Sequence, residues 1–309
     1  MITSIFKKST FLNYTLVVLL LLFFFSFAQI NQINTSKEVS SIVEKSIILV
    51  LLLASFFVVN FIVKKNGLTR NSSYAILFFL LFLVLFPSIL NNLKLILANF
   101  FILLATRRII SLQTLKAPKE KIFDASLWIF FACLFHFWCI LFLFIVYVSI
   151  VFHVSRDYRN WLVPFIAFGA SAVIFILFSL LFDVTWISQI ISQTQMNFQW
   201  DYFVNNYKKV ALTIFALTSI YFVFSMIFTL GNKPLVLQAS YKKMIFSFFV
   251  GIVIFLFSPE KSNAILVFTF LPLSVLCTNN IEYSHNKTYQ EIVLFTVAIA
   301  TITCFFFQL

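Results

Sequence analysis

Charged side chains are scarce in this sequence: Asp, Glu, Lys and Arg make up 10% of its 309 residues, whereas hydrophobic residues make up 62%. Ordinary soluble domains carry about 25% charged and about 45–50% apolar residues. A water-soluble globule of this size needs more polar surface than this chain provides. Repeated crossing of a membrane accounts for so much apolar surface, and each helical crossing takes about 20 mostly apolar residues. The composition therefore predicts an all-α, polytopic transmembrane helical bundle that forms one integral membrane domain over residues 1–309.

Glycine and cysteine are also scarce, with four residues of each. Neither glycine-rich phosphate-binding pattern, GxxxxGK[ST] or GxGxxG, occurs, which argues against nucleotide hydrolysis and dinucleotide chemistry. The lack of a GxxxG motif and of glycine hinges argues against alternating-access transport. The cysteines show no CxxC spacing and lie within apolar runs. We therefore expect no disulfide framework, no metal site and no cofactor.

Hydrophobic blocks separated by polar connectors run along the chain and give about 11 segments. The first is expected to be an uncleaved span at about 14–28, because no signal-peptide cleavage site follows it. The later blocks lie at about 46–63, 74–90, 94–106, 125–153, 162–182, 210–230, 244–258, 264–278 and 291–308. Their backbones are expected to be helical, because lipid offers no hydrogen-bond partner to a free amide.

The block at 125–153 decides the topology. As one helix it would be roughly 40 Å long, whereas two helices broken near His136 and Trp138 would form a short or re-entrant hairpin. Length does not choose between these two interpretations. With the N-terminus in the cytoplasm, the hairpin places 16 of the 22 basic residues on the cytoplasmic side, and a single span places 13 there. The positive-inside rule therefore favours the hairpin.

Basic residues account for the net charge of +12, and they lie in short loops between hydrophobic blocks. This placement indicates retention at the cytoplasmic face of a membrane rather than binding of nucleic acid. The connector at 107–121 has apolar residues interleaved with its charges, so a short interfacial helix is expected there. It is either a topology anchor or a site for anionic lipid headgroups, which gain about 1 kcal/mol per basic residue. The candidate headgroup-binding residues are Arg107, Arg108, Lys116, Lys119 and Lys121.

Two connectors on the opposite side carry candidate recognition groups. The connector at 183–209 combines aromatic rings, which can cover the C–H faces of sugars, with amides and carboxylates, which can bond hydroxyls. The alternative is an amphipathic segment that lies on the bilayer. In the connector at 30–45, Glu38 or Glu44 could act as a general base, or the loop could simply be solvated. The candidate substrate-binding residues are Trp186, Trp200, Asp201, Lys208 and Lys209.

Four stretches carry a family resemblance: MITSIFKKSTFLNYTLVV at 1–18, RNSSYAILFFLLFLVLFP at 70–87, IFDASLWIFFACLFHFW at 122–138 and RDYRNWLVPFIAFG at 156–169. Together they resemble an uncharacterised family of polytopic inner-membrane proteins of Bacteroidota, whose members are sometimes mislabelled beta-carotene monooxygenases. The resemblance implies a location in the bacterial inner membrane with a cytoplasmic N-terminus. It implies no activity.

The pattern RR-x(14)-FDASLWI-x(3)-CLF from Arg107, followed by RDYRNWLVPF, is similar to the middle of GT-C-type membrane glycosyltransferases. In that class an acid in the first outer loop assists transfer of a sugar from a polyprenyl-phosphate donor. The similarity implies Glu38 or Glu44 as the base, Lys208 or Lys209 as the phosphate clamp, and a polyprenyl-phosphate-linked sugar as the partner. The alternative function is a non-catalytic structural or assembly subunit of a cell-envelope membrane complex, with protein partners. The sequence leaves open whether the protein is an enzyme.

Overall fold

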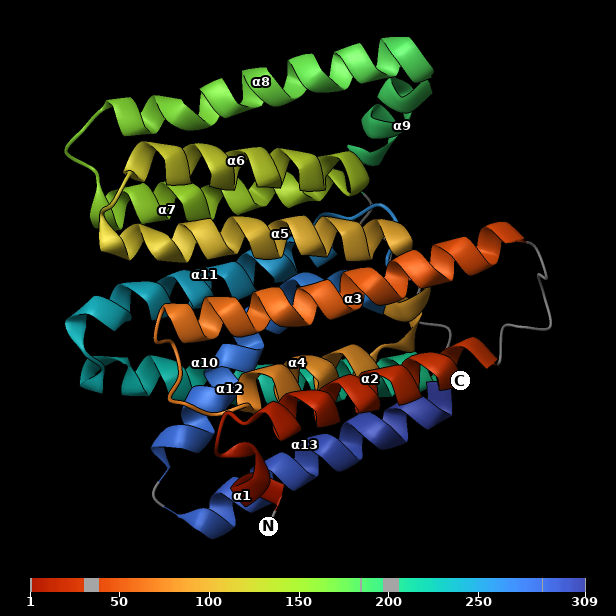
Figure 1. The fold of residues 1–309 in the computed structure, drawn as a ribbon, viewed down its shortest axis with the longest axis vertical. Coiled ribbons are helices and arrows are strands. Elements are labelled where there is room, and N and C mark those ends of the chain that lie inside the picture. The colour runs from red at the N-terminus through yellow and green to blue at the C-terminus, as the bar shows by residue number, and fades with distance from the viewer. Residues whose placement is uncertain (1, 31–38, 184, 197–205, 285, 309) are drawn as a thin grey trace.

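The computed structural model describes residues 2–30, 39–183, 185–196, 206–284 and 286–308, and all regular structure in these ranges is helical (Figure 1). The α-helices are α1 (Ile2–Phe6), α2 (Phe11–Ile30), α3 (Val39–Lys65), α4 (Tyr74–Leu85), α5 (Leu93–Ser111), α6 (Pro118–Phe135), α7 (Leu143–His153), α8 (Arg159–Phe182), α9 (Thr185–Gln193), α10 (Asn206–Thr229), α11 (Leu235–Phe257), α12 (Phe270–Tyr283) and α13 (Lys287–Gln308). Five 3-10 helices connect or extend them: η1 (Pro87–Asn91), η2 (Leu112–Thr114), η3 (Phe137–Phe142), η4 (Leu230–Asn232) and η5 (Asn263–Thr269).

Each predicted hydrophobic segment corresponds to a helix, so the all-α bundle is confirmed. Within the described ranges, eight helices are long and apolar enough to cross a membrane. The apolar stretches at Tyr74–Leu85 and Phe137–His153 are shorter. Two helices were not predicted: α1 precedes the first span, and α9 lies inside the predicted aromatic connector.

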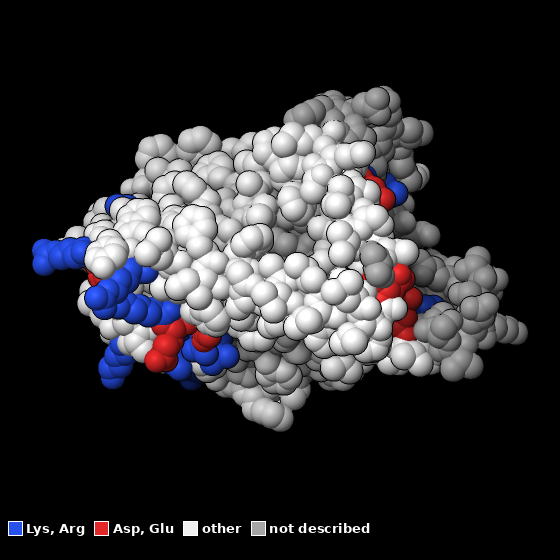
Figure 2. Space-filling model, turned by 90° about the horizontal axis from the view of Figure 1, so that it is seen from above, with Lys and Arg blue, Asp and Glu red and all other residues white. Residues whose placement is uncertain are grey.

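The long helices lie side by side, and their connectors gather at two ends of the bundle (Figure 1). One end, termed the basic end, carries the connectors 66–73, 112–117, 154–158 and 230–234. Hydrogen bonds brace this end: the Tyr241 hydroxyl of α11 donates to the Leu68 carbonyl in the first connector at 2.6 Å, and the Lys243 amine of α11 donates to the Ile109 carbonyl in the last turn of α5 at 2.9 Å. The opposite end, termed the distal end, carries the connectors 86–92 and 258–262 and the helix α9. In Figure 2, Lys and Arg side chains gather at one end, and a broad surface without charge separates the two ends.

The segment after α5 folds as the predicted hairpin, with α6 as one arm and η3 with α7 as the other. The chain breaks at His136, whose extended backbone (φ −148°, ψ 101°) ends α6. An ion pair of 3.0 Å between Lys119 and Asp157 joins the start of α6 to the residues after α7, so both arms meet at the basic end. The arms are longer than predicted, because α6 begins at Pro118 and its 18 residues span roughly 27 Å. The hairpin therefore runs through the depth of the bundle.

The prediction of a short interfacial helix at 107–121 is wrong. Residues up to Ser111 continue α5 as its last turn, and η2 and a short loop lead directly into α6. Ile109, Ile110 and Leu112 are buried in the protein core instead of facing lipid. Packing against neighbouring helices offers these side chains more contacts than a membrane surface would, because protein interiors are close-packed.

Aromatic rings fill the centre of the bundle, where α4 packs against α10 and α12. Every residue of α4 is buried. The ring of Phe270 lies 6.0 Å from that of Phe82, and the ring of Phe215 lies 5.8 Å from Phe82 in an edge-to-face contact. Phe86 stacks on Phe270 at 6.1 Å. Interlocked rings thus supply the van der Waals contact that small residues supply at many membrane helix interfaces.

Gly251 marks a close approach between α11 and η5. A Cβ atom at this position would lie 2.5 Å from Thr269 Cγ2 and 3.3 Å from the Phe268 carbonyl carbon. The Thr269 hydroxyl donates to the Leu266 carbonyl at 2.6 Å, which restrains its rotation. We expect Gly251→Ala to destabilise the protein by about 1–3 kcal/mol through overpacking. The measurement is the melting temperature in detergent.

Gly169 provides the matched control for this substitution. It lies in α8, and a Cβ atom there would meet no other atom within 4 Å. Because alanine favours the helix over glycine by up to about 1 kcal/mol, Gly169→Ala should leave the melting temperature unchanged or raise it. Equal stability of the two variants would contradict the packing of α11 against η5.

The positive-inside rule predicts that the basic end faces the cytoplasm. The native cysteines are all buried, so single cysteines introduced at exposed positions can report orientation. Lys116→Cys at the basic end should react with a membrane-impermeant thiol reagent only after cells are permeabilised. Gln195→Cys at the distal end should react in intact cells. The reverse labelling pattern would invert the predicted topology.

Candidate functional site

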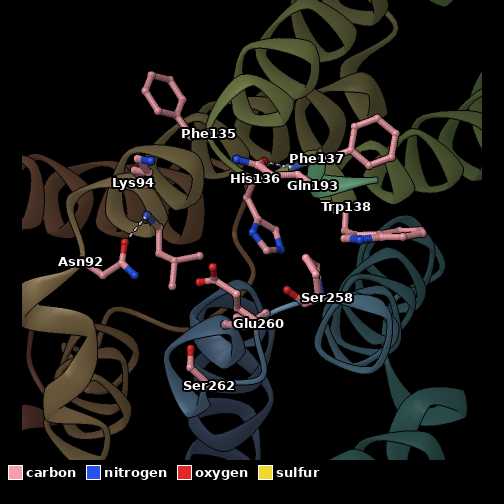
Figure 3. Close-up of a pocket in the computed structure, with 13 residues that line it drawn as sticks. Asn92, Lys94, Phe135, His136, Phe137, Trp138, Gln193, Ser258, Glu260 and Ser262 are labelled. Atoms are coloured by element: carbon pink, nitrogen blue, oxygen red, sulfur yellow. Dashed lines mark hydrogen bonds between the residues drawn. The ribbon is translucent and has the colours of Figure 1, made fainter. Parts of the chain in front are cut away.

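A polar cavity of about 160 Å³ lies at the distal end. Its walls come from four separate parts of the chain: the start of α5, the hairpin tip, the end of α9 and the connector between α11 and η5 (Figure 3). Its polar lining residues include Asn92, Lys94, His136, Gln193, Ser258 and Glu260. The cavity thus gathers a cation, a carboxylate, an imidazole, amides and a hydroxyl from positions distant in sequence.

Local hydrogen bonds hold three of these elements in place. Asn92 is the N-cap of α5, and its side-chain oxygen accepts from the Leu95 amide at 3.1 Å. This cap places Lys94 in the first turn of α5. Gln193, the last residue of α9, accepts from the Phe137 amide at 3.3 Å and so ties α9 to the hairpin tip (Figure 3).

The hairpin tip carries two buried polar groups on residues that border this cavity. The Nε2 atom of His136 and the Nε1 atom of Trp138 are buried and have no hydrogen-bond partner among the described residues. Trp138 is only 6% exposed. A buried polar atom without a partner costs roughly 1–3 kcal/mol, so such atoms beside a cavity are suited to bond a ligand or ordered water. The side chains of His136 and Glu260 extend into the same space (Figure 3).

Burial also determines the charge of His136. Loss of solvent around the ring lowers the pKa of His136 from 6.5 to about 4. The imidazole is therefore neutral at pH 7 and can act as a hydrogen-bond donor or acceptor but not as a cation. Lys94 and Glu260 then carry the charges of the lining, one of each sign.

An apolar groove of about 510 Å³ adjoins the polar cavity and shares with it the lining residues Lys94, Phe135 and Gln193. It lies between α6 and α8 and is covered by α9, which folds back from the end of α8 (Figure 1). Its other lining residues are Phe131, Leu134, Ile174, Phe175, Phe178, Trp186, Gln189 and Ile190. The polar cavity and the groove therefore lie next to each other, and Lys94 borders both.

Several predicted substrate-binding residues lie at this end of the bundle. Trp186 in α9 lines the apolar groove. Lys208 and Lys209 lie in the first turn of α10, and the Lys208 carbonyl accepts from the Asn263 side chain at 3.0 Å, beside the connector that carries Glu260. Neither lysine is among the residues that line the cavity or the groove. Trp200 and Asp201 lie outside the described residues.

The two predicted catalytic carboxylates are not at the described site. Glu44 is exposed near the start of α3 and does not line the cavity or the groove. Glu38 lies outside the described residues. Sequence reasoning missed Glu260 and Lys94, although each sits in or next to a short polar connector on the same predicted side as 183–209. Their predicted position on the same side of the membrane was the signal that could have placed these two residues in one candidate site.

Most of the predicted headgroup-binding residues make contacts within the protein. Arg108 pairs with Asp124 at 2.9 Å, and Lys119 pairs with Asp157 at 3.0 Å. Lys121 donates to the Ser111 carbonyl at 2.8 Å, and the Arg107 guanidinium lies 4.3 Å from the centre of the Phe61 ring. Lys116 is exposed. These contacts brace the basic end, and a role in headgroup binding stays a prediction.

Long apolar helices, a charge-free surface between two polar ends and the absence of strands from the described ranges define a multi-pass α-helical membrane protein. A family of unknown function (DUF6427) matches residues 1–309, and the chain belongs to that family. No curated protein and no solved structure matches the chain. Within the described ranges, no group of three His, Cys, Asp or Glu residues is placed to hold a metal ion.

The pKa of His136 predicts a pH dependence of stability. The unfolded chain binds a proton at this residue below pH 6.5, whereas the folded protein does so only near pH 4. The contribution of a neutral His136 to the free energy of unfolding is therefore fully present above pH 6.5. It decreases as the pH drops toward 4, by up to about 3 kcal/mol. In detergent, the melting temperature of the His136→Phe variant should fall less between pH 7 and pH 4 than that of the wild type. Parallel pH profiles would contradict a buried neutral imidazole.

Proposed function

We propose that the protein binds a lipid-linked glycan at the distal end of the bundle. The supporting observation is the order of chemical character across the two neighbouring pockets: apolar groove, a cation that borders both, then a cavity lined by hydroxyls, amides and a carboxylate. A glycan carried on a polyprenyl phosphate has the same order of hydrocarbon chain, phosphate and sugar. Lys94 would contact the phosphate, because it lines both the groove and the polar cavity.

The groove is suited to a hydrocarbon chain that arrives from the bilayer. One wall is α8, a helix that is largely exposed and would face lipid along most of its length. Phe178 is 52% exposed although it lines the groove, so a chain could pass from the membrane into the site without crossing water. Burial of a chain of this kind contributes about 0.8 kcal/mol per methylene relative to water.

The polar cavity is suited to a sugar rather than to a second phosphate. Its lining has one cation and one carboxylate, so it offers no surplus of positive charge. Carboxylate, amide and hydroxyl groups bond sugar hydroxyls, while the ring of Trp138 and that of Phe137 provide apolar faces. The buried nitrogens of His136 and Trp138 would gain partners when such a headgroup binds.

Glycan transfer is the catalytic form of this proposal. Transfer requires a carboxylate that takes the proton of the accepting hydroxyl, and a cation that stabilises the departing phosphate. Glu38 and Glu44 are the predicted bases, and Lys208 and Lys209 the predicted clamp. Glu260 is the carboxylate that lines the cavity, so it competes with them for the first role, as Lys94 does for the second.

Lipids bound to the purified protein provide the test. Mass spectrometry of the extracted protein should detect a prenyl-phosphate glycan in the wild type. Lys94→Gln should lower its occupancy roughly tenfold, which is the loss expected for one charge-assisted hydrogen bond. Lys45→Gln is the matched control, because Lys45 lies near the start of α3 at the same end of the bundle and lines neither the cavity nor the groove. Equal losses in both variants, or no bound glycolipid in any sample, would contradict the proposal.

The alternative, a non-catalytic subunit of a cell-envelope membrane complex, makes a different prediction for the carboxylates. Surface glycans should then be unchanged by Glu38→Gln, Glu44→Gln and Glu260→Gln, in a strain that needs the protein. The short connectors and the exposed apolar surface of α8 favour this alternative, because they suit contact with another membrane protein.

A further inference from the structure

A second large cavity, of about 410 Å³, lies at the basic end of the bundle. It is bordered by the connector between α3 and α4, the end of α12, the start of α13 and the residue after α1. Three cations line it, Lys7, Arg70 and Lys287, and its one lining carboxylate is Glu282. This cavity belongs to a different end of the molecule from the proposed glycolipid site.

The carboxylate of Glu282 is satisfied by neutral donors. One oxygen accepts from the Arg70 backbone amide at 2.8 Å, and the other accepts from the Ser72 hydroxyl at 2.5 Å. Within the described ranges, no ion pair joins Lys7, Arg70 or Lys287 to a carboxylate. The lining therefore keeps a surplus of positive charge that faces the cavity.

The arrangement of Lys7 and Lys287 differs from that of several other cations at the basic end. Arg108 and Lys119 each pair with an aspartate, and Lys243 is buried with its amine bonded to a backbone carbonyl. Those contacts neutralise or occupy the cations. Among the cavity cations, the Arg70 guanidinium donates to the Glu282 carbonyl at 3.4 Å and lies 4.7 Å from the centre of the Tyr283 ring. All three cations border a space large enough for a polyatomic anion.

Hydrogen bonds hold the backbone around the cavity, so the segments that carry its cations are in place before a ligand arrives. The Tyr74 hydroxyl donates to the Thr3 carbonyl, and the Ser73 hydroxyl donates to the Lys8 carbonyl at 3.1 Å. These bonds fix the residues before α2 against the start of α4. Gln290 donates to the carbonyls of Ile281 at 3.0 Å and Ser284 at 2.8 Å, which holds the first turn of α13 against the end of α12.

We propose that this cavity binds a phosphate group through Lys7, Arg70 and Lys287. Phosphate suits a lining with three cations and one satisfied carboxylate, because it carries one or two negative charges and several acceptor oxygens. The group could belong to the headgroup of an anionic phospholipid or to a small soluble molecule. The proposal does not depend on the glycolipid site, because the two cavities share no residue.

The test uses the full-length protein in nanodiscs of phosphatidylcholine, either pure or mixed with phosphatidylglycerol. Inorganic phosphate is the soluble probe, and the readout is the melting temperature together with the apparent affinity for the probe. Phosphatidylglycerol or phosphate should stabilise the wild type. Lys7→Gln and Lys287→Gln should each weaken binding about fivefold, from the roughly 1 kcal/mol that a basic residue contributes near a membrane surface. Lys8→Gln is the matched control, because Lys8 is exposed, adjacent in sequence and outside the cavity lining.

The outcomes separate the two sources of phosphate. Stabilisation by phosphatidylglycerol alone supports a lipid headgroup, and stabilisation by inorganic phosphate in pure phosphatidylcholine supports a soluble ligand. Stabilisation by neither probe overturns the proposal. A Lys8→Gln variant that loses as much binding as Lys7→Gln also overturns it, because a diffuse surface charge would then explain the effect.

Discussion

A backbone amide without a hydrogen-bond partner costs several kcal/mol inside a bilayer, and the architecture of this protein follows from that constraint. Helices satisfy their amides internally, so each apolar segment is helical and the connectors are kept to the two ends. Chain reversals, buried charges and cavities with polar linings are therefore confined to the same two ends of the bundle. The polar cavity at the distal end and the cationic cavity at the basic end lie where irregular backbone is tolerated.

The same constraint removes the hydrophobic effect as a force between helices, because lipid tails are as apolar as the side chains. Close packing must hold the bundle together, and in a chain with four glycines it depends on large rings. Phe82, Phe215 and Phe270 interlock around the fully buried helix α4. Gly251 is an exception, where backbone contact between α11 and η5 excludes a side chain. The connector with Glu260 lies directly between these two elements, so this tight contact also positions part of the distal site.

Sequence patterns predicted the helices and the break at His136, because both depend on the residues of one continuous stretch of chain: its apolar length and the charges that flank it. For 183–209 they left open a recognition segment or an amphipathic segment on the bilayer, and Trp186 of this segment lines the groove. They did not predict which residues meet there. Lys94 lies in the first turn of α5, His136 at the hairpin tip and Glu260 in the connector between α11 and η5. Their convergence depends on how the helices pack rather than on their spacing in the sequence. The helix α9 was not delimited because its nine residues are too short for a membrane span, although its sequence is clearly amphipathic, as the alternative for 183–209 expected.

The length of the hairpin connects the fold to the distal site. A shallow re-entrant turn would have left His136 and Trp138 within the apolar layer, with buried nitrogens and no source of partners. Because α6 starts at Pro118 and runs through the bundle, the tip instead reaches the level of Asn92 and Glu260. The extended backbone at His136 then exposes the Phe137 amide, which bonds Gln193 and draws α9 over the groove. The arms that cross the apolar layer thus bring polar groups to the place where a headgroup could use them.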